Sequence, residues 1–288
     1  MQQRRRKIIN NNKIKMIALD LDGTTFNSSA ELSERNKEVI EEAIRQGIEV
    51  VISTGRAFSS LPDSIKSIHG IKYAITSNGA HIMDLENGKA IHSEYLSESA
   101  VRQVAKLSEE LDVDLEIFFK GQAYIDEEYY NYIRDNGCSY RNVKYVLWSR
   151  KPVRDIKSFM KKNISKIDNI NICFHSLDEL EAARPKVEAI TEATITASFR
   201  NNLEVGGPDT SKKNALIRIM DLLNISREEL MACGDAPNDI PMLEYAGIGV
   251  AMGNAWGGTK DYADYVTETN DEDGVALAIE KFVLKKKK

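Results

Sequence analysis

Short apolar runs recur along this sequence, and each leads into a small polar or acidic residue. The runs at 15–20, 48–53 and 73–76 come first, and the first two lead directly into Asp20 and Thr54. Continuous apolar runs of this length are typical of strands that are buried on both faces, as in a parallel sheet. Because the carboxyl ends of such strands share one edge, we expect the polar residues to meet there.

Helical patterns separate these runs. Ser33 is placed to cap a helix that ends at Gly47, and a second helix is predicted over 58–68. Alternation of strands and helices predicts an α/β fold, with a doubly wound, Rossmann-like parallel sheet that helices cover on both faces.

The rhythm changes in the middle of the chain and returns after Leu203. The middle is rich in Tyr and Phe and is predicted to form a separate α+β unit. Shorter strands are predicted around and within it at 80–83, 89–93, 115–119 and 123–125, and a helix is predicted at 99–111. Its tyrosines Tyr124, Tyr129, Tyr130 and Tyr132 are predicted to pack in its core. The last third continues with predicted helices at 211–223 and 237–245 and predicted strands at 230–233 and 248–252.

This pattern predicts two domains in one chain. Residues 1–84 and 204–288 are predicted to form the core domain, and residues 85–203 are predicted to be inserted into it. The basic segments at 4–7 and 285–288 are interpreted as solvated tails.

Composition narrows the function. The net charge of −5 argues against a nucleic-acid binder, and the lack of an apolar run of roughly 20 residues argues against a membrane partner. The start of the chain does not resemble a secretory signal. Three scattered cysteines predict neither disulfides nor a zinc site, so a cytoplasmic location is expected. The four histidines follow no metal-ligand pattern and are predicted to be structural or exposed.

Two aspartates follow the first strand, in Asp20-Leu21-Asp22-Gly23-Thr24. Carboxylates at a buried strand end are costly unless something pairs with them, and two close carboxylates repel each other. A divalent cation relieves both costs, since hard cations prefer oxygen ligands. A turn or helix cap is the alternative explanation of Asp and Gly at this place.

Three further places carry polar groups suited to a phosphate. Thr54 supplies a hydroxyl after the second strand, and Gly55 lets the backbone approach a ligand closely. Lys212 follows a predicted helix cap, where a cation opposes the helix dipole at a cost of roughly 0.3–1 kcal/mol. Lys213 is placed equally badly, so the pattern does not select between the two lysines.

The segment Gly234-Asp235-Ala236-Pro237-Asn238-Asp239 again places acids after a buried strand. Asp235 is at the strand end and is predicted to meet Asp20 across the sheet. A helix cap is the alternative explanation for Asp239.

Together and in this order, the four places resemble the four motifs of the haloacid dehalogenase superfamily of phosphohydrolases. The resemblance covers nearly the whole chain and is closest to the Cof-type sugar-phosphate phosphatases. Further phrases resemble that branch: Ser53-Thr54-Gly55-Arg56, Ser77-Asn78-Gly79-Ala80, Ala251-Met252-Gly253-Asn254-Ala255 and Asp273-Gly274-Val275-Ala276. The inserted middle third lies where that family carries its cap domain.

The resemblance implies a role for each motif residue. Asp20 would be the nucleophile and a Mg²⁺ ligand. Asp22 would be the general acid and base, with its main-chain carbonyl on the metal. Asp235 would be a further metal ligand. Thr54 and Lys212 would bind the transferring phosphoryl group.

It also implies supporting roles. The amides of Leu21 and Gly55 would donate to phosphate oxygens, and Asn238 and Asp239 would orient the phosphate, Lys212 or a metal-bound water. Asn78 and Asn254 would lie near the phosphate or the substrate. Departures from the branch occur at Lys213, Ala236 and Thr25, and none of them removes a catalytic group.

The implied function is Mg²⁺-dependent hydrolysis of small phosphate monoesters, such as sugar phosphates, through an aspartyl-phosphate intermediate. Two alternatives stay open at this stage, a phosphosugar mutase and a non-catalytic phosphosugar-binding regulator. The sequence does not identify the substrate, the cap residues that select it or the oligomeric state.

Overall fold

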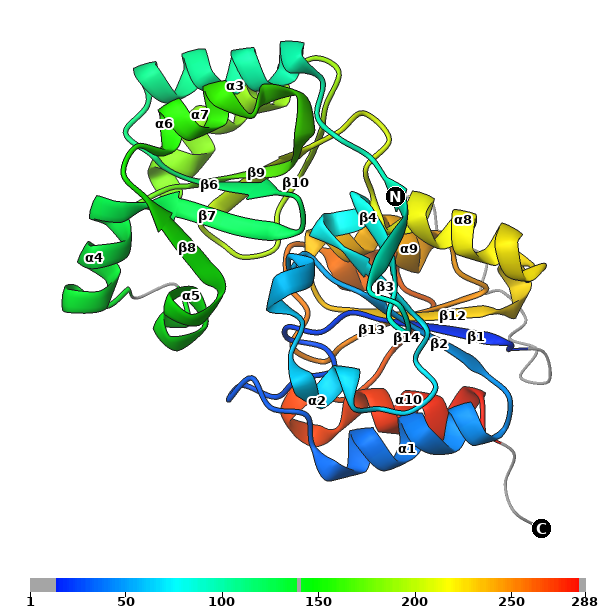
Figure 1. The fold of residues 1–288 in the computed structure, drawn as a ribbon. Helices are drawn as coiled ribbons and strands as arrows, with labels where there is room; N and C mark the ends of the chain where they lie inside the picture. The colour runs from blue at the N-terminus through cyan, green and yellow to red at the C-terminus, as the bar shows by residue number, and fades with distance from the viewer. Residues whose placement is uncertain (1–13, 139–140, 285–288) are drawn as a thin grey trace.

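The computed structural model describes residues 14–138 and 141–284, which form two units, each built on one sheet (Figure 1). The basic segments at 4–7 and 285–288 lie outside the described residues. We call the unit with the eight-stranded sheet the core and the unit with the six-stranded sheet the cap. Within the described residues, no helix combines the length and the apolar character needed to cross a membrane.

The core sheet has the strand order β14-β13-β12-β1-β2-β3-β4-β5. The first six strands in that order are parallel, and β4 and β5 are antiparallel to their neighbours. The strands are β1 (Met16–Leu19), β2 (Glu49–Ser53), β3 (Tyr73–Thr76), β4 (His81–Asp84), β5 (Lys89–Ser93), β12 (Leu230–Gly234), β13 (Ile248–Ala251) and β14 (Tyr265–Val266). The predicted α/β fold with a parallel, doubly wound sheet is confirmed.

Helices cover both faces of this sheet, as Figure 1 shows. One face carries α1 (Glu34–Arg45), α2 (Asp63–Lys66) and α10 (Gly274–Phe282), and the other carries α8 (Lys212–Leu223) and α9 (Ile240–Tyr245). Alternate residues of β1 pack on opposite faces: Ile17 and Leu19 face α1, whereas Met16 and Ala18 face α8. The predicted cap at Ser33 is confirmed, because its side chain accepts a hydrogen bond from the amide of Asn36.

The predicted single helix over 58–68 is wrong. A 3₁₀ turn at Phe58–Ser60 and the short α2 stand in its place. Pro62 explains the break, because its ring disfavours helical backbone at the preceding residue and it lacks an amide proton. Leu61 accordingly has an extended ψ of 123°.

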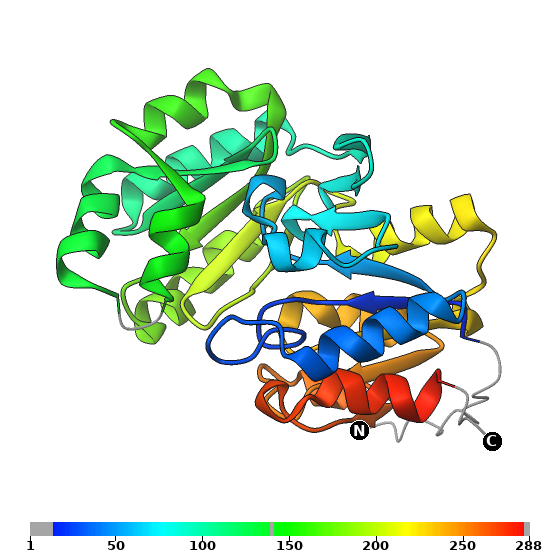
Figure 2. The same cartoon turned by 60° about the horizontal axis from the view of Figure 1, so that its bottom comes forward.

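The cap sheet has the order β10-β11-β9-β6-β7-β8. Its strands are β6 (Asp114–Phe119), β7 (Gln122–Asp126), β8 (Arg150–Val153), β9 (Ile167–Cys173), β10 (Thr194–Thr196) and β11 (Asn202–Gly206). One face is covered by α3 (Glu98–Glu110), α6 (Ile156–Lys162) and α7 (Leu177–Glu188). The cap also contains α4 (Glu127–Asn136) and α5 (Val143–Ser149). Figure 2 shows the green cap beside the end of the core from which the blue loop after β1 emerges.

Sheet membership bears on the predicted domain boundaries at 85 and 203. The strand β5 pairs with β4 in the core sheet, and β11 pairs with β9 in the cap sheet. We therefore propose that the cap begins after Ser93 and ends near Gly206.

The predicted packing of the cap tyrosines holds for three of the four. Tyr124, Tyr129 and Tyr130 pack against hydrophobic clusters of the cap, but Tyr132 is 60% exposed. The prediction for Tyr132 is wrong because α4 buries only the stripe through Tyr129 and Ile133, which are one helical turn apart.

Replacement of Gly79 by Ala is expected to destabilise the protein by about 2–5 kcal/mol. Gly79 has a φ of +110°, and a Cβ there would lie 2.3 Å from the backbone oxygen of Ser211, the residue that caps α8. Gly88→Ala is the matched control, since Gly88 also has a positive φ, +67°, but has open space around it. Denaturant unfolding of both variants tests the prediction, and equal losses would contradict it.

Candidate active site

Three of the predicted site residues lie together at the carboxyl edge of the core sheet. Asp20 follows the central strand β1, Thr54 follows β2, and Asp235 follows β12 on the other side of β1. All three side chains are nearly buried. Parallel pairing therefore brings together residues that are more than 200 positions apart in the sequence.

Lys212 enters this edge from the first turn of α8. Its ammonium Nζ lies 2.7 Å from Asp20 Oδ1 and 2.6 Å from Asp239 Oδ1, and its side chain is fully buried. Lys213 is only partly buried. The structure thus selects Lys212 of the two lysines, and it pairs Lys212 with the predicted nucleophile.

Burial and close charges shift the pKa values of the acids around Lys212 and of Lys212 itself. Burial raises the pKa of Asp20 to about 7, although Lys212 acts in the opposite direction. Burial also raises the pKa of Asp235 well above its ordinary value, and Asp20 adds to this shift. Burial alone would lower the pKa of Lys212, but Asp20 and Asp239 outweigh it and raise that pKa.

Three carboxylates form a group of the right size for a cation. Asp20, Asp235 and Asp239 each offer an oxygen, and these oxygens lie within 4.8 Å of one another. Three acids against the single ammonium of Lys212 leave an excess of negative charge, which a divalent cation with oxygen ligands would neutralise. The residues therefore fit a divalent metal.

Neighbouring groups hold these acids in place. Thr24 Oγ1 donates to Asp235 Oδ1 over 2.9 Å, and the amides of Asp235 and Ala236 donate to Asp239 Oδ2 over 2.9 and 3.0 Å. A Cβ at Gly23 would lie 2.5 Å from Asp235 Oδ2, so the glycine of the first motif makes room for that carboxylate.

The departure at Thr25 also has a local role. Its hydroxyl donates to the main-chain oxygen of Asp20 over 2.5 Å, which fixes the turn that carries Asp20. Thr25 is fully buried, so an unpaired hydroxyl would be unfavourable there.

Asp22 has a partner that the sequence analysis did not assign. Arg56 donates from Nε to Asp22 Oδ2 over 2.7 Å and from Nη2 to Oδ1 over 2.6 Å. The side chain of Asp22 is 54% exposed, whereas that of Arg56 is 5% exposed. The ring of Tyr145, from the cap, lies 4.3 Å from the guanidinium carbon of Arg56. The only sequence signal for Arg56 was its place in the second motif.

A cavity of about 210 Å³ lies between core and cap at this edge. It is lined by Asp20, Thr54 and Gly55 from the core and by Arg141, Tyr145 and Glu204 from the cap. Gly55 would place a Cβ 3.0 Å from Asn78 Oδ1, so the backbone is tightly packed here. Donation of the Leu21 and Gly55 amides to a phosphate stays a prediction.

The three predicted asparagines have different positions. Asn238 lines the cavity, and its Nδ2 donates to Asn78 Oδ1 over 3.0 Å. Asn78 Nδ2 in turn donates to Glu204 of the cap over 2.5 Å, so Asn78 links the core to the cap. Asn254 Nδ2 donates to the main-chain oxygen of Gly23 over 2.8 Å, which suits a role in holding the first-motif turn.

The cap contributes a polar row that the sequence analysis missed. Glu116, Asn171 and Glu204 are paired directly across β6, β9 and β11, and all three are buried. Their sequence neighbours, such as Leu115 and Ile117, face the helices on the other side of the sheet. The sequence did contain a signal for this row, which was the alternation of Asn and Ile within 167–173. Asn is unfavourable in a buried strand unless it has a hydrogen-bond partner, so a regular series of Asn on one face indicates a polar site.

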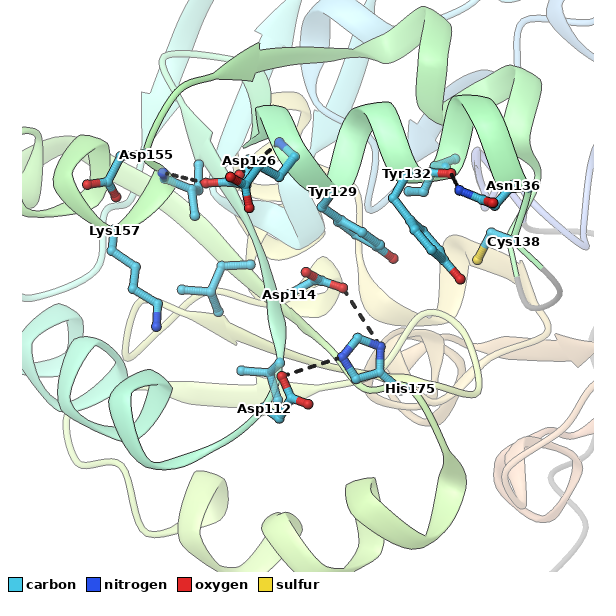
Figure 3. A pocket seen from close by; sticks show the side chains of 16 residues that line it. Asp112, Asp114, Asp126, Tyr129, Tyr132, Asn136, Cys138, Asp155, Lys157 and His175 are labelled. Atoms are coloured by element: carbon cyan, nitrogen blue, oxygen red, sulfur yellow. Dashed lines mark hydrogen bonds and ion pairs between the residues drawn. The ribbon is translucent and has the colours of Figure 1, made fainter.

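A second and larger cavity, of about 870 Å³, lies in the cap (Figure 3). Five of its sixteen lining residues are acidic, and His175 lies 3.9 Å from both Asp112 and Asp114. Burial raises the pKa of Asp114 to about 6. None of the predicted phosphate-binding residues lines this cavity, so it is separate from the candidate active site.

Comparison with known proteins agrees with the fold and the motifs. The family model for haloacid dehalogenase-like hydrolases matches residues 17–279. Phosphatase YwpJ of Bacillus subtilis is 36% identical over 91% of this chain and 98% of its own length. 5-amino-6-(5-phospho-D-ribitylamino)uracil phosphatase YcsE of the same species is 31% identical over 94% of this chain and 96% of its own length.

A solved structure gives the same result. The haloacid dehalogenase-like hydrolase from B. subtilis superposes with a TM-score of 0.79 and 34% identity, and the match covers 94% of this chain and all of the other. The predicted resemblance is confirmed, and the chain belongs to the haloacid dehalogenase-like hydrolase family.

Proposed function

We propose that this hydrolase cleaves small phosphate monoesters with a divalent metal, Mg²⁺, and with Asp20 as the nucleophile. The observation that carries the proposal is the buried contact of Lys212 with both Asp20 and Asp239, next to a metal-sized group of carboxylates. A lysine and a cation at this place would neutralise the charge of a transferring phosphoryl group.

The reaction would proceed by two displacements. In the first, a carboxylate oxygen of Asp20 bonds to phosphorus, the bond from phosphorus to the leaving oxygen breaks, and Asp22 gives that oxygen a proton. In the second, Asp22 takes a proton from water, the water oxygen bonds to phosphorus, and the bond to Asp20 breaks. The metal, held by Asp20 and Asp235 and the main-chain carbonyl of Asp22, would supply charge neutralisation at the phosphate oxygens.

The observed pairing of Asp22 adds one step to this mechanism. A carboxylate that both nitrogens of Arg56 engage is an acceptor only, so it has no proton to donate. Before the first displacement, Asp22 would therefore have to release Arg56 and take up a proton from water, and it would then pass that proton to the leaving oxygen. The ring of Tyr145 in the cap packs against the guanidinium group of Arg56, so a movement of Arg56 would change a contact between the core and the cap.

Phosphate release from a panel of sugar and polyol phosphates, with Mg²⁺ and with a chelator, tests the proposed function. Release that requires the metal supports the proposal. Release that occurs equally in the chelator contradicts the metal dependence. Turnover that needs an added bisphosphate and yields no free phosphate would indicate a mutase instead.

Mg²⁺ is expected to raise the thermal unfolding midpoint, and to raise it more at pH 8 than at pH 6. The folded-state pKa of Asp20, about 7, lies above its ordinary value of 3.8. Between pH 3.8 and about 7, Asp20 therefore holds a proton in the metal-free folded state that it has lost in the unfolded state. The stability of the metal-free folded state therefore falls as the pH rises from about 4 to about 7. The metal binds the ionised carboxylate and reverses this loss.

Thermal unfolding with and without Mg²⁺ at the two pH values gives the measurement. Asp235→Asn should reduce the shift, while Asp221→Asn, on the exposed side of α8, should leave it unchanged. A metal shift of the same size at both pH values would contradict the assignment of Asp20 as a ligand.

A further inference from the structure

Two arginines of the cap line the active-site cavity. Arg141 precedes α5, Arg150 begins β8, and their side chains are 4% and 5% exposed. Burial of a guanidinium group is costly without a partner, so each of these two arginines needs a charged or hydrogen-bonding partner nearby. Their shared partner is Glu116 of β6.

Glu116 holds the two guanidinium groups with both of its carboxylate oxygens. Arg141 Nη1 donates to Oε1 over 2.6 Å, and Arg150 donates from Nε to Oε1 over 3.2 Å and from Nη2 to Oε2 over 3.0 Å. Asn171 Nδ2 also donates to Oε2, over 2.9 Å. Burial would raise the pKa of Glu116, but the two arginines outweigh it and lower that pKa, so Glu116 is ionised.

The charges of this cluster do not balance. Two guanidinium groups share one carboxylate, which leaves one excess positive charge beside the cavity. Arg56, the third arginine that lines the cavity, belongs to the core and pairs with Asp22 in this structure, so it is not part of this cluster. Glu204 lies two strands away across the sheet, where its carboxylate oxygens accept hydrogen bonds from Asn78, Ser198 and Asn202.

The excess charge lies within reach of a small ligand in the phosphate site. The ring of Tyr145 lies between the core and this cluster, 4.3 Å from the guanidinium carbon of Arg56 and 4.9 Å from that of Arg150. The cavity volume of about 210 Å³ is smaller than the roughly 300 Å³ of the smallest pockets that usually bind drug-sized ligands, so a ligand in it must be small. A monoester whose phosphate is near Asp20 would therefore present its leaving group to the cap arginines.

We propose that Arg141 and Arg150, held by Glu116, form a second anion-binding subsite that selects phosphate monoesters whose leaving group carries another anionic group. The proposal rests on the proposed function, because it describes the leaving-group side of the same cavity. A guanidinium fork binds a carboxylate or a phosphate through the same paired donors, so the shared chemistry is a second anion.

Two matched pairs of esters test this subsite. In the first pair, 3-phosphoglycerate carries a carboxylate where glycerol 3-phosphate carries a hydroxymethyl group. In the second pair, fructose 1,6-bisphosphate carries a second phosphate that fructose 6-phosphate lacks. Calorimetric binding to the Asp20→Asn variant with Mg²⁺ is expected to favour the more anionic member of at least one pair by about tenfold or more. The favoured pair identifies the carboxylate or the phosphate as the second anion.

Arg141→Gln is expected to bring that ratio of dissociation constants down to within about twofold of one. The matched control is Arg134→Gln, the same change at an exposed arginine of α4 that pairs only with its neighbour Asp135 among the described residues, and it should keep the full ratio. Arg141→Lys retains the charge and should keep part of the ratio, which provides a second variant if the first folds poorly.

The outcomes separate this inference from the proposed function. Equal binding within both pairs, or an undiminished ratio in the Arg141→Gln variant, overturns the subsite. A ratio that depends on Arg141 supports the subsite even if the wild-type protein releases no phosphate, a result that would count against the proposed hydrolysis alone. Phosphate release without any preference would leave hydrolysis in place and overturn the subsite.

Discussion

Asp20→Asn is expected to lower kcat for phosphate release by about 10⁴-fold or more, the range seen when a covalent nucleophile is removed. An amide in place of the carboxylate has no charged oxygen to attack phosphorus. It would also weaken metal binding, because Asp20 is one of the three acids whose oxygens lie within 4.8 Å of one another. Phosphate release with Mg²⁺ from the best ester of the panel is the measurement.

Folding of this variant is expected to survive. Burial raises the pKa of Asp20 to about 7, so the charged form is costly in the metal-free protein, and a neutral amide removes that cost. Lys212 would keep its ion pair with Asp239. The metal-free variant should thus unfold at the wild-type temperature or above it at pH 8.

Asp221→Asn makes the same chemical change on the exposed side of α8 and controls for it. Its rate and stability should match the wild-type values. Near-normal phosphate release from the Asp20→Asn variant would sink the assignment of the nucleophile. A variant that is inactive only because it is unfolded would show a lowered midpoint instead.

The core half of the site could be predicted because its signals are local. Asp20, Thr54 and Asp235 each directly follow an apolar strand, and parallel pairing places every such strand end at one edge. The structure confirms that these residues share this edge, while their catalytic roles stay predictions.

The cap half could not be predicted in the same way. Glu116, Asn171 and Glu204 meet only through antiparallel pairing of strands that are separated by up to 88 positions, and no local pattern fixes that pairing. The strands β9 and β11 were not predicted either, since Asn and Glu on one face hide the apolar alternation of the other.

Side-chain pairing was a further limit of the sequence. The pattern could not decide between Lys212 and Lys213, because the choice depends on which one the first turn of α8 directs at Asp20 and Asp239. Nor could it show that Asp22 is engaged by Arg56, since the motif fixes the positions of both residues but not the rotamers that join them.

Lys212→Met is expected to lower kcat by on the order of 10³-fold and to destabilise the metal-free protein by about 3–5 kcal/mol at pH 8. The neutral side chain keeps most of the volume but leaves Asp20, Asp235 and Asp239 buried without their cation. Phosphate release and denaturant unfolding in a chelator are the two measurements. Lys213→Met, the same change at the next residue, is the matched control and should have little effect on either.

The pH dependence of this loss distinguishes electrostatics from packing. Lys212 lowers the pKa of Asp20, so without Lys212 the folded-state pKa of Asp20 would rise above its present value of about 7. An acid with a raised folded-state pKa contributes most stability when protonated, so the penalty should be largest at pH 8 and should shrink as the pH falls below about 7. Mg²⁺ should reduce the penalty as well, because it supplies the missing positive charge. A penalty that is independent of both pH and metal would mean that Lys212 acts through packing, and the charge balance proposed for this site would then be wrong.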